Sequence, residues 1–263
     1  MNKEILETFI KVSQEFIGNS NSLHKLGTKS KQLENASTKQ ILDTLNLKDK
    51  EVIYTSGKCE SNNLTIFGLD ALQKNKNVIV SSNEDDTILL PLKHSSFEIR
   101  TIDITDNKVN LTQLNNLIDK NTSLVSISNI ENINEVSNFL KGKKCYYHTD
   151  LSNNYKEINY NNIDLITIED NSLEGFGCLI KNKNIILEPI FHGGKSTTTY
   201  RSGTPALPFI ASFSRLIRLK YKKWNIANNN KGDINEKKAN NKMRCSYMWI
   251  LQLRLRYVRS WRN

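Results

Sequence analysis

The residues most suited to chemistry lie in the polar turn TSGKCES, residues 55–61. A nucleotide P-loop is excluded, because it requires a second glycine five residues before Gly57, where Val52 stands. Cys59 could be a nucleophile, since a thiol at a helix N-terminus beside Lys58 is partly thiolate. Alternatively, Gly57 could let the backbone N–H groups of a helix N-terminus approach the phosphate of a ligand. Both of these interpretations stay open at this point.

The elements that must position this turn are predicted from seven short apolar runs. They are EVIYT (51–55), NVIVSS (77–82), FEIRTIDI (97–104), SLVSIS (123–128), KCYYHTD (144–150), IDLITI (163–168) and GCLIKN (177–182). Helical stretches lie between most of them, and two further helices precede the first. This order predicts an α/β fold with a mainly parallel sheet flanked by helices. Because ligands bind at the carboxyl ends of such strands, the turns after residues 55 and 150 are the expected site.

The charge of the chain is concentrated near its end. The 263 residues carry a formal net charge of +10, but residues 214–263 contain 14 Lys and Arg against 2 Asp and Glu. We therefore expect a main domain at 1–220 and a divergent basic tail at 221–263. The tail has no recognised nucleic-acid motif, so we do not expect it to bind nucleic acid specifically. The four cysteines form no C-x-x-C pair, so we expect no metal site. The absence of a secretory or membrane-spanning run favours the cytoplasm.

Four segments, in order, carry a resemblance to a known family. They are GNSNSLHKLG (18–27), TSGKCESNNL (55–64), YHTD (147–150) and HGGKSTTTYRSGT (192–204). The chain resembles the cysteine desulfurases, pyridoxal-phosphate enzymes of the class V aminotransferase superfamily. The resemblance implies the large domain of that fold, without its first strand and its C-terminal small domain. It also implies a dimer, L-cysteine as substrate, and a role in supplying sulfur for iron–sulfur cluster or thio-cofactor assembly.

The resemblance also assigns candidate cofactor ligands. Gly57, Lys58 and Cys59 match the turn that binds the cofactor phosphate, which we call the phosphate seat, although the family has a threonine where this chain has Cys59. Asp150 matches the aspartate that pairs with the pyridine nitrogen and keeps the ring an electron sink. The alternative is that Asp150 caps the next segment by accepting from backbone N–H groups.

Three further residues match positions that contact the cofactor or the substrate in the family. Arg201 matches the arginine that receives the substrate carboxylate, a task suited to a guanidinium; a surface salt bridge is the alternative. Asn153 matches a family glutamine that contacts the oxygen on the cofactor ring; the alternative is that Asn153 only forms a turn. Asn134 matches a family asparagine when a short insertion is allowed.

The sequence departs from the family where the central chemistry lies. The lysine that forms the Schiff base is replaced, in IEDNSLEGFG (168–177), by Glu169 or Ser172, and neither can form an imine. Asp85 takes the place of the histidine that stacks on the cofactor ring. Cys245 matches no family motif, so the persulfide-forming cysteine has no counterpart.

These departures predict a truncated, catalytically defective desulfurase homologue. Two alternatives remain open. The chain could be a non-catalytic partner that dimerises with an intact desulfurase, or it could descend from a class V aminotransferase or a selenocysteine lyase.

Overall fold

A computed structural model describes residues 2–73, 75–152, 160–194 and 198–229. By its internal contacts the chain divides into two units, residues 1–221 and 222–263, and the described part of the second is the end of one helix. The predicted domain boundary at residue 220 falls inside that helix, α7 (Leu207–Asn229).

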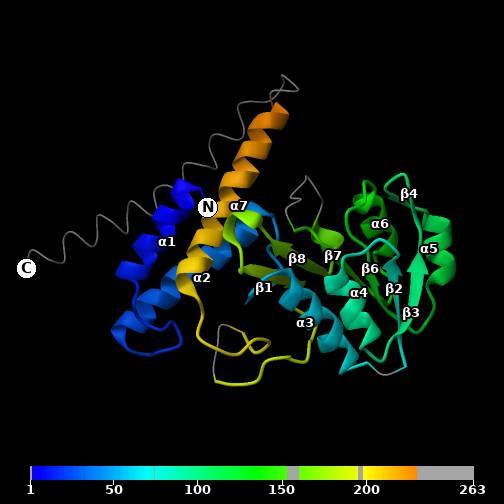
Figure 1. Cartoon of the computed structure of the whole chain (residues 1–263), viewed down its shortest axis with the longest axis horizontal. Coiled ribbons are helices and arrows are strands. Elements are labelled where there is room, and N and C mark those ends of the chain that lie inside the picture. Colours follow the sequence, from blue (N-terminus) through cyan, green and yellow to red (C-terminus); the bar gives the residue numbers. More distant parts are fainter. Residues whose placement is uncertain (1, 74, 153–159, 195–197, 230–263) are drawn as a thin grey trace, which may run out of the picture. The chain divides into compact units, whose positions relative to one another are not determined.

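All seven predicted strands are present in one sheet, in the order β1-β9-β8-β7-β6-β2-β3 (Figure 1). Their bounds are β1 Lys50–Thr55, β2 Asn77–Ser81, β3 Glu98–Ile102, β6 Thr122–Ser126, β7 Tyr146–Asp150, β8 Leu165–Glu169 and β9 Gly177–Asn182. Strands β3, β2, β6, β7 and β8 run parallel, whereas β9 is antiparallel to both β8 and β1. The expected mainly parallel sheet is therefore confirmed, and β9 is its one antiparallel strand. The short strands β4 (Ile104–Thr105) and β5 (Lys108–Val109) form a separate hairpin.

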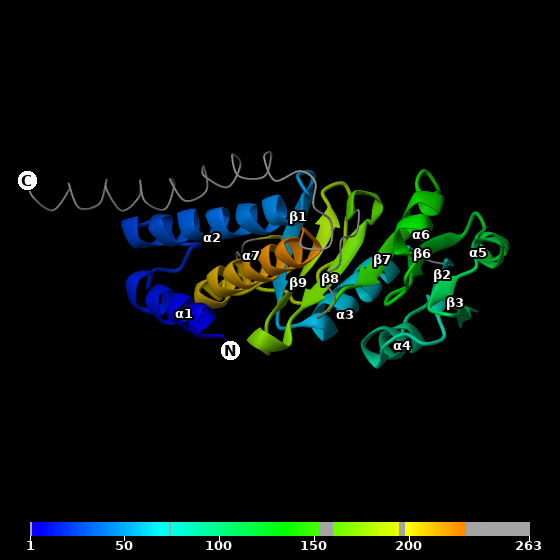
Figure 2. The ribbon, with the colours of Figure 1, turned by 90° about the horizontal axis from the view of Figure 1, so that it is seen from above.

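Helices cover both faces of this sheet (Figure 2). Their bounds are α1 Lys3–Glu15, α2 Lys25–Thr44, α3 Lys58–Asp70, α4 Asp86–Lys93, α5 Leu111–Leu117 and α6 Ile133–Leu140, with short 3₁₀ turns η1 at Tyr160–Asn162 and η2 at Asn171–Leu173. Helices α3 and α4 pack on one face, and α2, α5, α6 and α7 on the other. Successive strand residues alternate between the two cores: Leu165 belongs to the α3/α4 side and Ile166 to the opposite side. This double coverage explains the almost continuously apolar strands.

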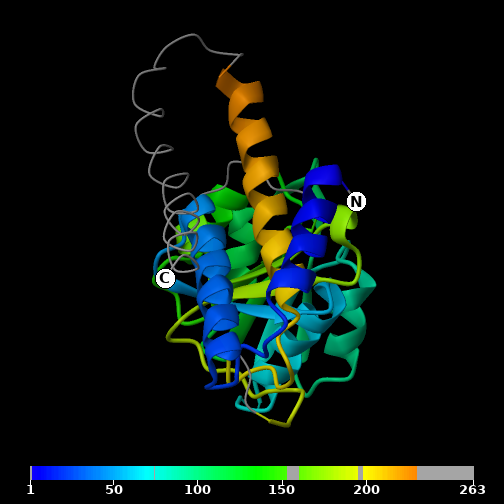
Figure 3. The same ribbon diagram turned by 90° about the vertical axis from the view of Figure 1, so that its left-hand side faces the viewer.

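Helices α1, α2 and α7 lie side by side at the β1 end of the sheet (Figure 3). Ile5, Ile41 and Phe213, one from each helix, are buried in the same core. The rings of Phe9 and Phe209 add an edge-to-face contact with centroids 4.9 Å apart. Within the described chain, no helix is both apolar enough and long enough to span a bilayer.

The topology brings the predicted site together at one edge of the sheet. Strand β1 runs in the same direction as β8, because both are antiparallel to β9. The carboxyl ends of β1, β2, β6, β7 and β8 therefore share an edge, and α3 and α4 begin there. This is the edge at which α/β proteins bind ligands.

Candidate functional site

The turn after β1 is built around Gly57, the residue that precedes α3. Its φ angle of 138° is one that glycine adopts readily and other residues rarely do. The Thr55 and Ser61 hydroxyls lie 2.8 Å apart, and the Ser56 N–H donates to the Glu60 carboxylate at 2.7 Å. These bonds fix the N-terminus of α3 at the carboxyl edge of the sheet. The first N–H groups of such a helix can bind an anion.

Glu169, the last residue of β8, supplies an anion at this helix terminus. One of its carboxylate oxygens accepts from the Lys58 backbone N–H at 2.9 Å. A Cβ atom at Gly57 would lie 3.2 Å from the other oxygen, and a Cβ atom at Gly177 would lie 3.0 Å from the Gly57 Cα. Both glycines therefore allow β8, β9 and α3 to approach closely. The carboxylate of Glu169 is thus in contact with the predicted phosphate seat.

The ammonium group of Lys58 is paired with Asp85. The Lys58 Nζ lies 2.6 Å from the Asp85 carboxylate, which also caps α4 by accepting from the Thr87 N–H at 2.9 Å. Partial burial opposes ionisation of Asp85, but the hydrogen bonds from Lys58 and Thr87 lower its pKa to about 2. The same hydrogen bond raises the pKa of Lys58. The lysine predicted to bind a phosphate is therefore neutralised by a carboxylate of its own chain.

Asp150 ends β7 and is buried, with 5% of its surface exposed. One carboxylate oxygen accepts from the Ser152 N–H at 2.9 Å, and the other from the Asn62 side-chain amide at 3.0 Å. The first contact is the capping role that was one of its two sequence interpretations. Pairing with a ring nitrogen stays a prediction: each oxygen has one hydrogen bond here and can accept another.

Asn62 is the centre of a buried polar network that sequence reasoning missed. Its amide nitrogen donates to Thr87 at 2.9 Å as well as to the carboxylate at the end of β7, and its amide oxygen accepts from the Thr167 hydroxyl at 2.7 Å. His148 links Thr167, at 3.1 Å, to Ser126, at 2.8 Å. Thr167 gives its one hydrogen to Asn62, so the His148 Nε2 must be the protonated nitrogen that donates to Thr167. Burial lowers the pKa of His148 to about 4, which keeps the imidazole neutral.

Glu84 adds a second, partly buried carboxyl group close to Asp150. It accepts from the Ser128 N–H at 2.6 Å, and burial raises its pKa to about 7, with smaller contributions from the charges of Asp150 and Asp85. The edge of the sheet is consequently rich in carboxyl groups. Among the described residues, these carboxyl groups outnumber the two cations at the first turn of α3, Lys58 and Arg201.

Arg201 lies against the first turn of α3. Its Nε donates to the Glu60 carboxylate at 3.0 Å, and its guanidinium carbon lies 6.0 Å from the centroid of the Phe191 ring. Among the described residues, its two terminal nitrogens have no hydrogen-bond acceptor. The geometry is thus compatible with Arg201 binding a carboxylate, with Glu60 holding it in place.

The other predicted site residues are distributed around this edge. Cys59 is exposed in the first turn of α3, where its sulfur accepts from the Asn63 amide at 3.7 Å. Asn134 is exposed in the first turn of α6. Ser172 lies in η2, where its N–H donates to the Asp170 carboxylate at 2.8 Å. Asn153 lies outside the described residues.

Two lysines other than Lys58 could in principle substitute for a Schiff-base lysine. Lys181 is fully buried, is paired with Glu51 and has its Nζ 4.3 Å from the centroid of the Tyr200 ring. Lys195 lies outside the described residues. Lys181 is therefore committed to the sheet and not to the site.

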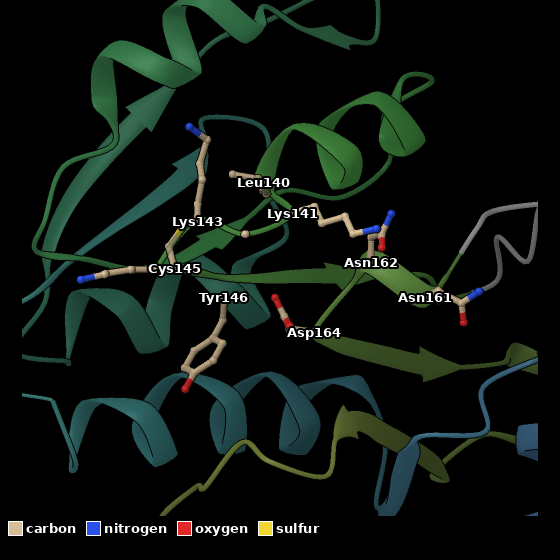
Figure 4. Close-up of a pocket in the computed structure, with 10 residues that line it drawn as sticks. Leu140, Lys141, Lys143, Cys145, Tyr146, Asn161, Asn162 and Asp164 are labelled. Atoms are coloured by element: carbon tan, nitrogen blue, oxygen red, sulfur yellow. The ribbon is translucent and has the colours of Figure 1, made fainter.

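A separate cavity of about 320 Å³ lies at the opposite, amino ends of β7 and β8. Its lining is Leu140, Lys141, Gly142, Lys143, Lys144, Cys145, Tyr146, Asn161, Asn162 and Asp164. Figure 4 shows Lys141 extending toward Asn162 and Lys143 pointing away from Asp164. The Lys143 Nζ instead lies 4.4 Å from the centroid of the Phe139 ring. In the described chain, no group of three His, Cys, Asp or Glu side chains could hold a metal ion.

Comparison with known proteins places this arrangement in a family. The curated relatives include the mitochondrial cysteine desulfurase of Candida albicans, 31% identical over 239 residues, and the cysteine desulfurase IscS of Methanosarcina thermophila, 29% identical over 237 residues. Each match covers 82% of this chain, but only 49% and 59% of the relatives. The chain thus spans about half of the length of the first of these and three-fifths of the second.

Solved structures show the same fold. A NifS-like protein superposes on this chain with a TM-score of 0.78 at 23% sequence identity. The superposition covers 86% of this chain and 68% of the NifS-like protein. The NifS-like protein from Rickettsia africae gives a TM-score of 0.76, also at 23% sequence identity. This superposition covers 85% of this chain and 67% of the Rickettsia protein. The family model for class-V aminotransferases matches residues 1–244. On these grounds the chain belongs to the class-V aminotransferase family, and its similarity within that family is to the cysteine desulfurases.

Proposed function

We propose that this chain is a cysteine desulfurase-like protein that does not turn over L-cysteine. The observation that carries the proposal is the position of Glu169. Its carboxylate stands at the end of β8, at one of the two positions, with Ser172, to which family resemblance assigns the lysine, and accepts from the first N–H of α3. A carboxylate cannot form the imine that links a lysine to the cofactor.

Pyridoxal phosphate is the cofactor that the family implies, and the residues present do not fit it. The phosphate seat faces the carboxylate of Glu169, and Lys58 is neutralised by Asp85. We therefore derive no reaction step through this cofactor.

Turnover of L-cysteine tests the proposal directly. Purified protein is supplied with pyridoxal phosphate, L-cysteine and a thiol reductant, which reduces any sulfane sulfur to sulfide, and both sulfide and alanine are measured against a heat-inactivated sample. We expect the native sample to release no more sulfide and no more alanine than the heat-inactivated sample. Sulfide and alanine in equal amounts, above the heat-inactivated sample and lost on substitution Arg201→Ala, would show that the chain is an active desulfurase.

A second candidate function is that of a partner for an intact homologue, or for a second copy of this chain. It is favoured by apolar side chains that are exposed on α1, at the start of α2 and in the loop between them. These are Leu6 (44% exposed), Ile10 (46%), Ile17 (74%), Leu23 (99%) and Leu26 (49%). Surface patches of this kind often mark protein–protein contacts.

The size of the protein in solution, alone and mixed with an intact desulfurase, tests this second function. We expect a dimer, formed with itself or with the homologue, and its loss in the double variant Ile17→Glu, Leu23→Glu. The matched control is Leu72→Glu, because Leu72 is also exposed (48%) but lies outside the patch. A monomer under both conditions would contradict the partner function.

A further inference from the structure

The contact between Glu169 and α3 has the geometry of a bound ligand. The carboxylate oxygen lies 2.9 Å from the Lys58 N–H, in line with a charge-assisted hydrogen bond. The donor is the backbone N–H of the first residue of α3, a helix of 13 residues, and the helix dipole favours a negative charge at this end. We propose that Glu169 fills the phosphate seat from within the chain, and that this side chain decides which ligands the seat can bind. The inference rests on the proposed function, in which the seat no longer holds a cofactor.

The backbone around the seat is shaped to admit this carboxylate. Gly57 has a φ angle of 138°, and a Cβ atom there would come within 3.2 Å of the Glu169 carboxylate. A Cβ atom at Gly177, directly opposite Glu169 in the β8–β9 ladder, would lie 2.7 Å from the Ile168 carbonyl oxygen. The approach of Glu169 to α3 is therefore built into two strands and a turn, and is not a chance contact of a surface side chain.

The charges around the seat oppose a phosphate as long as Glu169 is present. The ammonium of Lys58 belongs to the first turn of α3, and it feels the charges of Asp85, Asp150 and Glu169 together. A phosphate dianion at the seat would thus meet more negative than positive charge. Without Glu169, the first N–H of α3 would be unpaired and the local charge would be less negative by one unit.

Binding of phosphate-bearing and phosphate-free forms of one ligand tests this inference. Pyridoxal 5′-phosphate, pyridoxal and inorganic phosphate are titrated into wild-type protein, Glu169→Ala and Glu174→Ala. Glu174 is the matched control, because it is an exposed carboxylate five residues along the same segment. We expect Glu169→Ala to bind pyridoxal phosphate about tenfold or more tightly than pyridoxal, since helix-terminus interactions reach this size. Wild type and Glu174→Ala should bind the two ligands alike.

A second measurement keeps the inference falsifiable if Glu169→Ala is unstable. Glu169→Gln retains the size and the hydrogen-bond acceptor but removes the charge. Inorganic phosphate should raise its thermal midpoint, and that of Glu169→Ala, but not that of wild type. The inference is overturned if wild type prefers the phosphorylated ligand as strongly as the variants do, or if no variant gains phosphate binding.

The two proposals fail separately. Release of sulfide by wild-type protein would contradict the proposed function whatever the phosphate titrations show. A preference of wild type for phosphate without turnover would contradict the inference about Glu169 alone.

Discussion

The two ends of strands β7 and β8 differ in charge. At the carboxyl ends, where the fold of this family binds ligands, Lys58 is surrounded by the carboxyl groups of Asp85, Asp150 and Glu169. At the amino ends, a cavity is lined by three lysines and one aspartate. An anion would therefore find a more favourable potential at the end that α/β proteins do not ordinarily use. The difference supports the proposal that this chain retains the fold while the charge pattern needed for the family's ligand is lost.

The carboxyl end is stabilised by hydrogen bonds between protein side chains, and Asn62 is at their centre. Removing the Asn62 amide should have the largest effect on stability. We expect Asn62→Ala to lower the free energy of unfolding by about 3 kcal/mol, because it leaves buried partners of the amide unpaired. Chemical denaturation measures the change. Asn63→Ala is the control on the same helix, and it should cost less than about 1 kcal/mol. Equal losses of unfolding free energy in the two variants would mean that the Asn62 network contributes no more to stability than a half-exposed asparagine does.

The carboxyl end should also show opposite pH responses from two groups, the partly buried Glu84 and the buried His148. Glu84 has its pKa raised to about 7, so it favours the folded state at low pH and loses this contribution as the pH rises from about 4.5 to 7. His148 has its pKa lowered to about 4, so its contribution rises with pH from about 4 to 6.5. In wild type the two slopes oppose each other between pH 4.5 and 6.5.

The substitution Glu84→Gln should therefore expose the slope due to His148. We expect the stability of Glu84→Gln to rise more steeply with pH than that of wild type between pH 4.5 and 6.5. Denaturation midpoints at several pH values measure this, with Glu174→Gln as the exposed control. Parallel curves for wild type and Glu84→Gln would show that Glu84 titrates normally in the folded protein.

The smallest expected effect concerns the ion pair at the surface of the site. The Lys58 and Asp85 side chains are 33% and 43% exposed, and exposed pairs contribute little to stability. We expect Lys58→Ala to cost less than about 0.5 kcal/mol. Asp85→Ala should cost about 1 kcal/mol, because it also removes the cap of α4. A larger loss for Lys58→Ala than for Asp85→Ala would contradict this assignment of roles.

The fold was largely predictable because its strands are short apolar runs separated by turn-forming residues. The two turns after residues 55 and 150 also lie at one edge of the sheet, as predicted, since strand direction alone brings them together. The partners of the site residues were not predictable. Asn62 and His148 have polar side chains in otherwise ordinary segments, and their hydrogen bonds join residues between 19 and 105 positions apart in the chain.

The position of Glu169 shows the same limit. The pattern of the segment left Glu169 and Ser172 as equal alternatives for the place of the lysine. Only the register of β8 against β9, with Glu169 opposite Gly177, shows which side chain reaches the seat.

The central claim is that this chain has a desulfurase-like fold without a place for a covalently bound cofactor. It is tested most directly by adding pyridoxal phosphate to the wild-type protein, recording the visible absorbance before and after borohydride reduction, and mapping labelled peptides by mass. We predict no adduct enriched at a single lysine. A stoichiometric adduct on one residue, such as Lys58 or Lys195, would contradict the claim and would identify a substitute for the missing lysine.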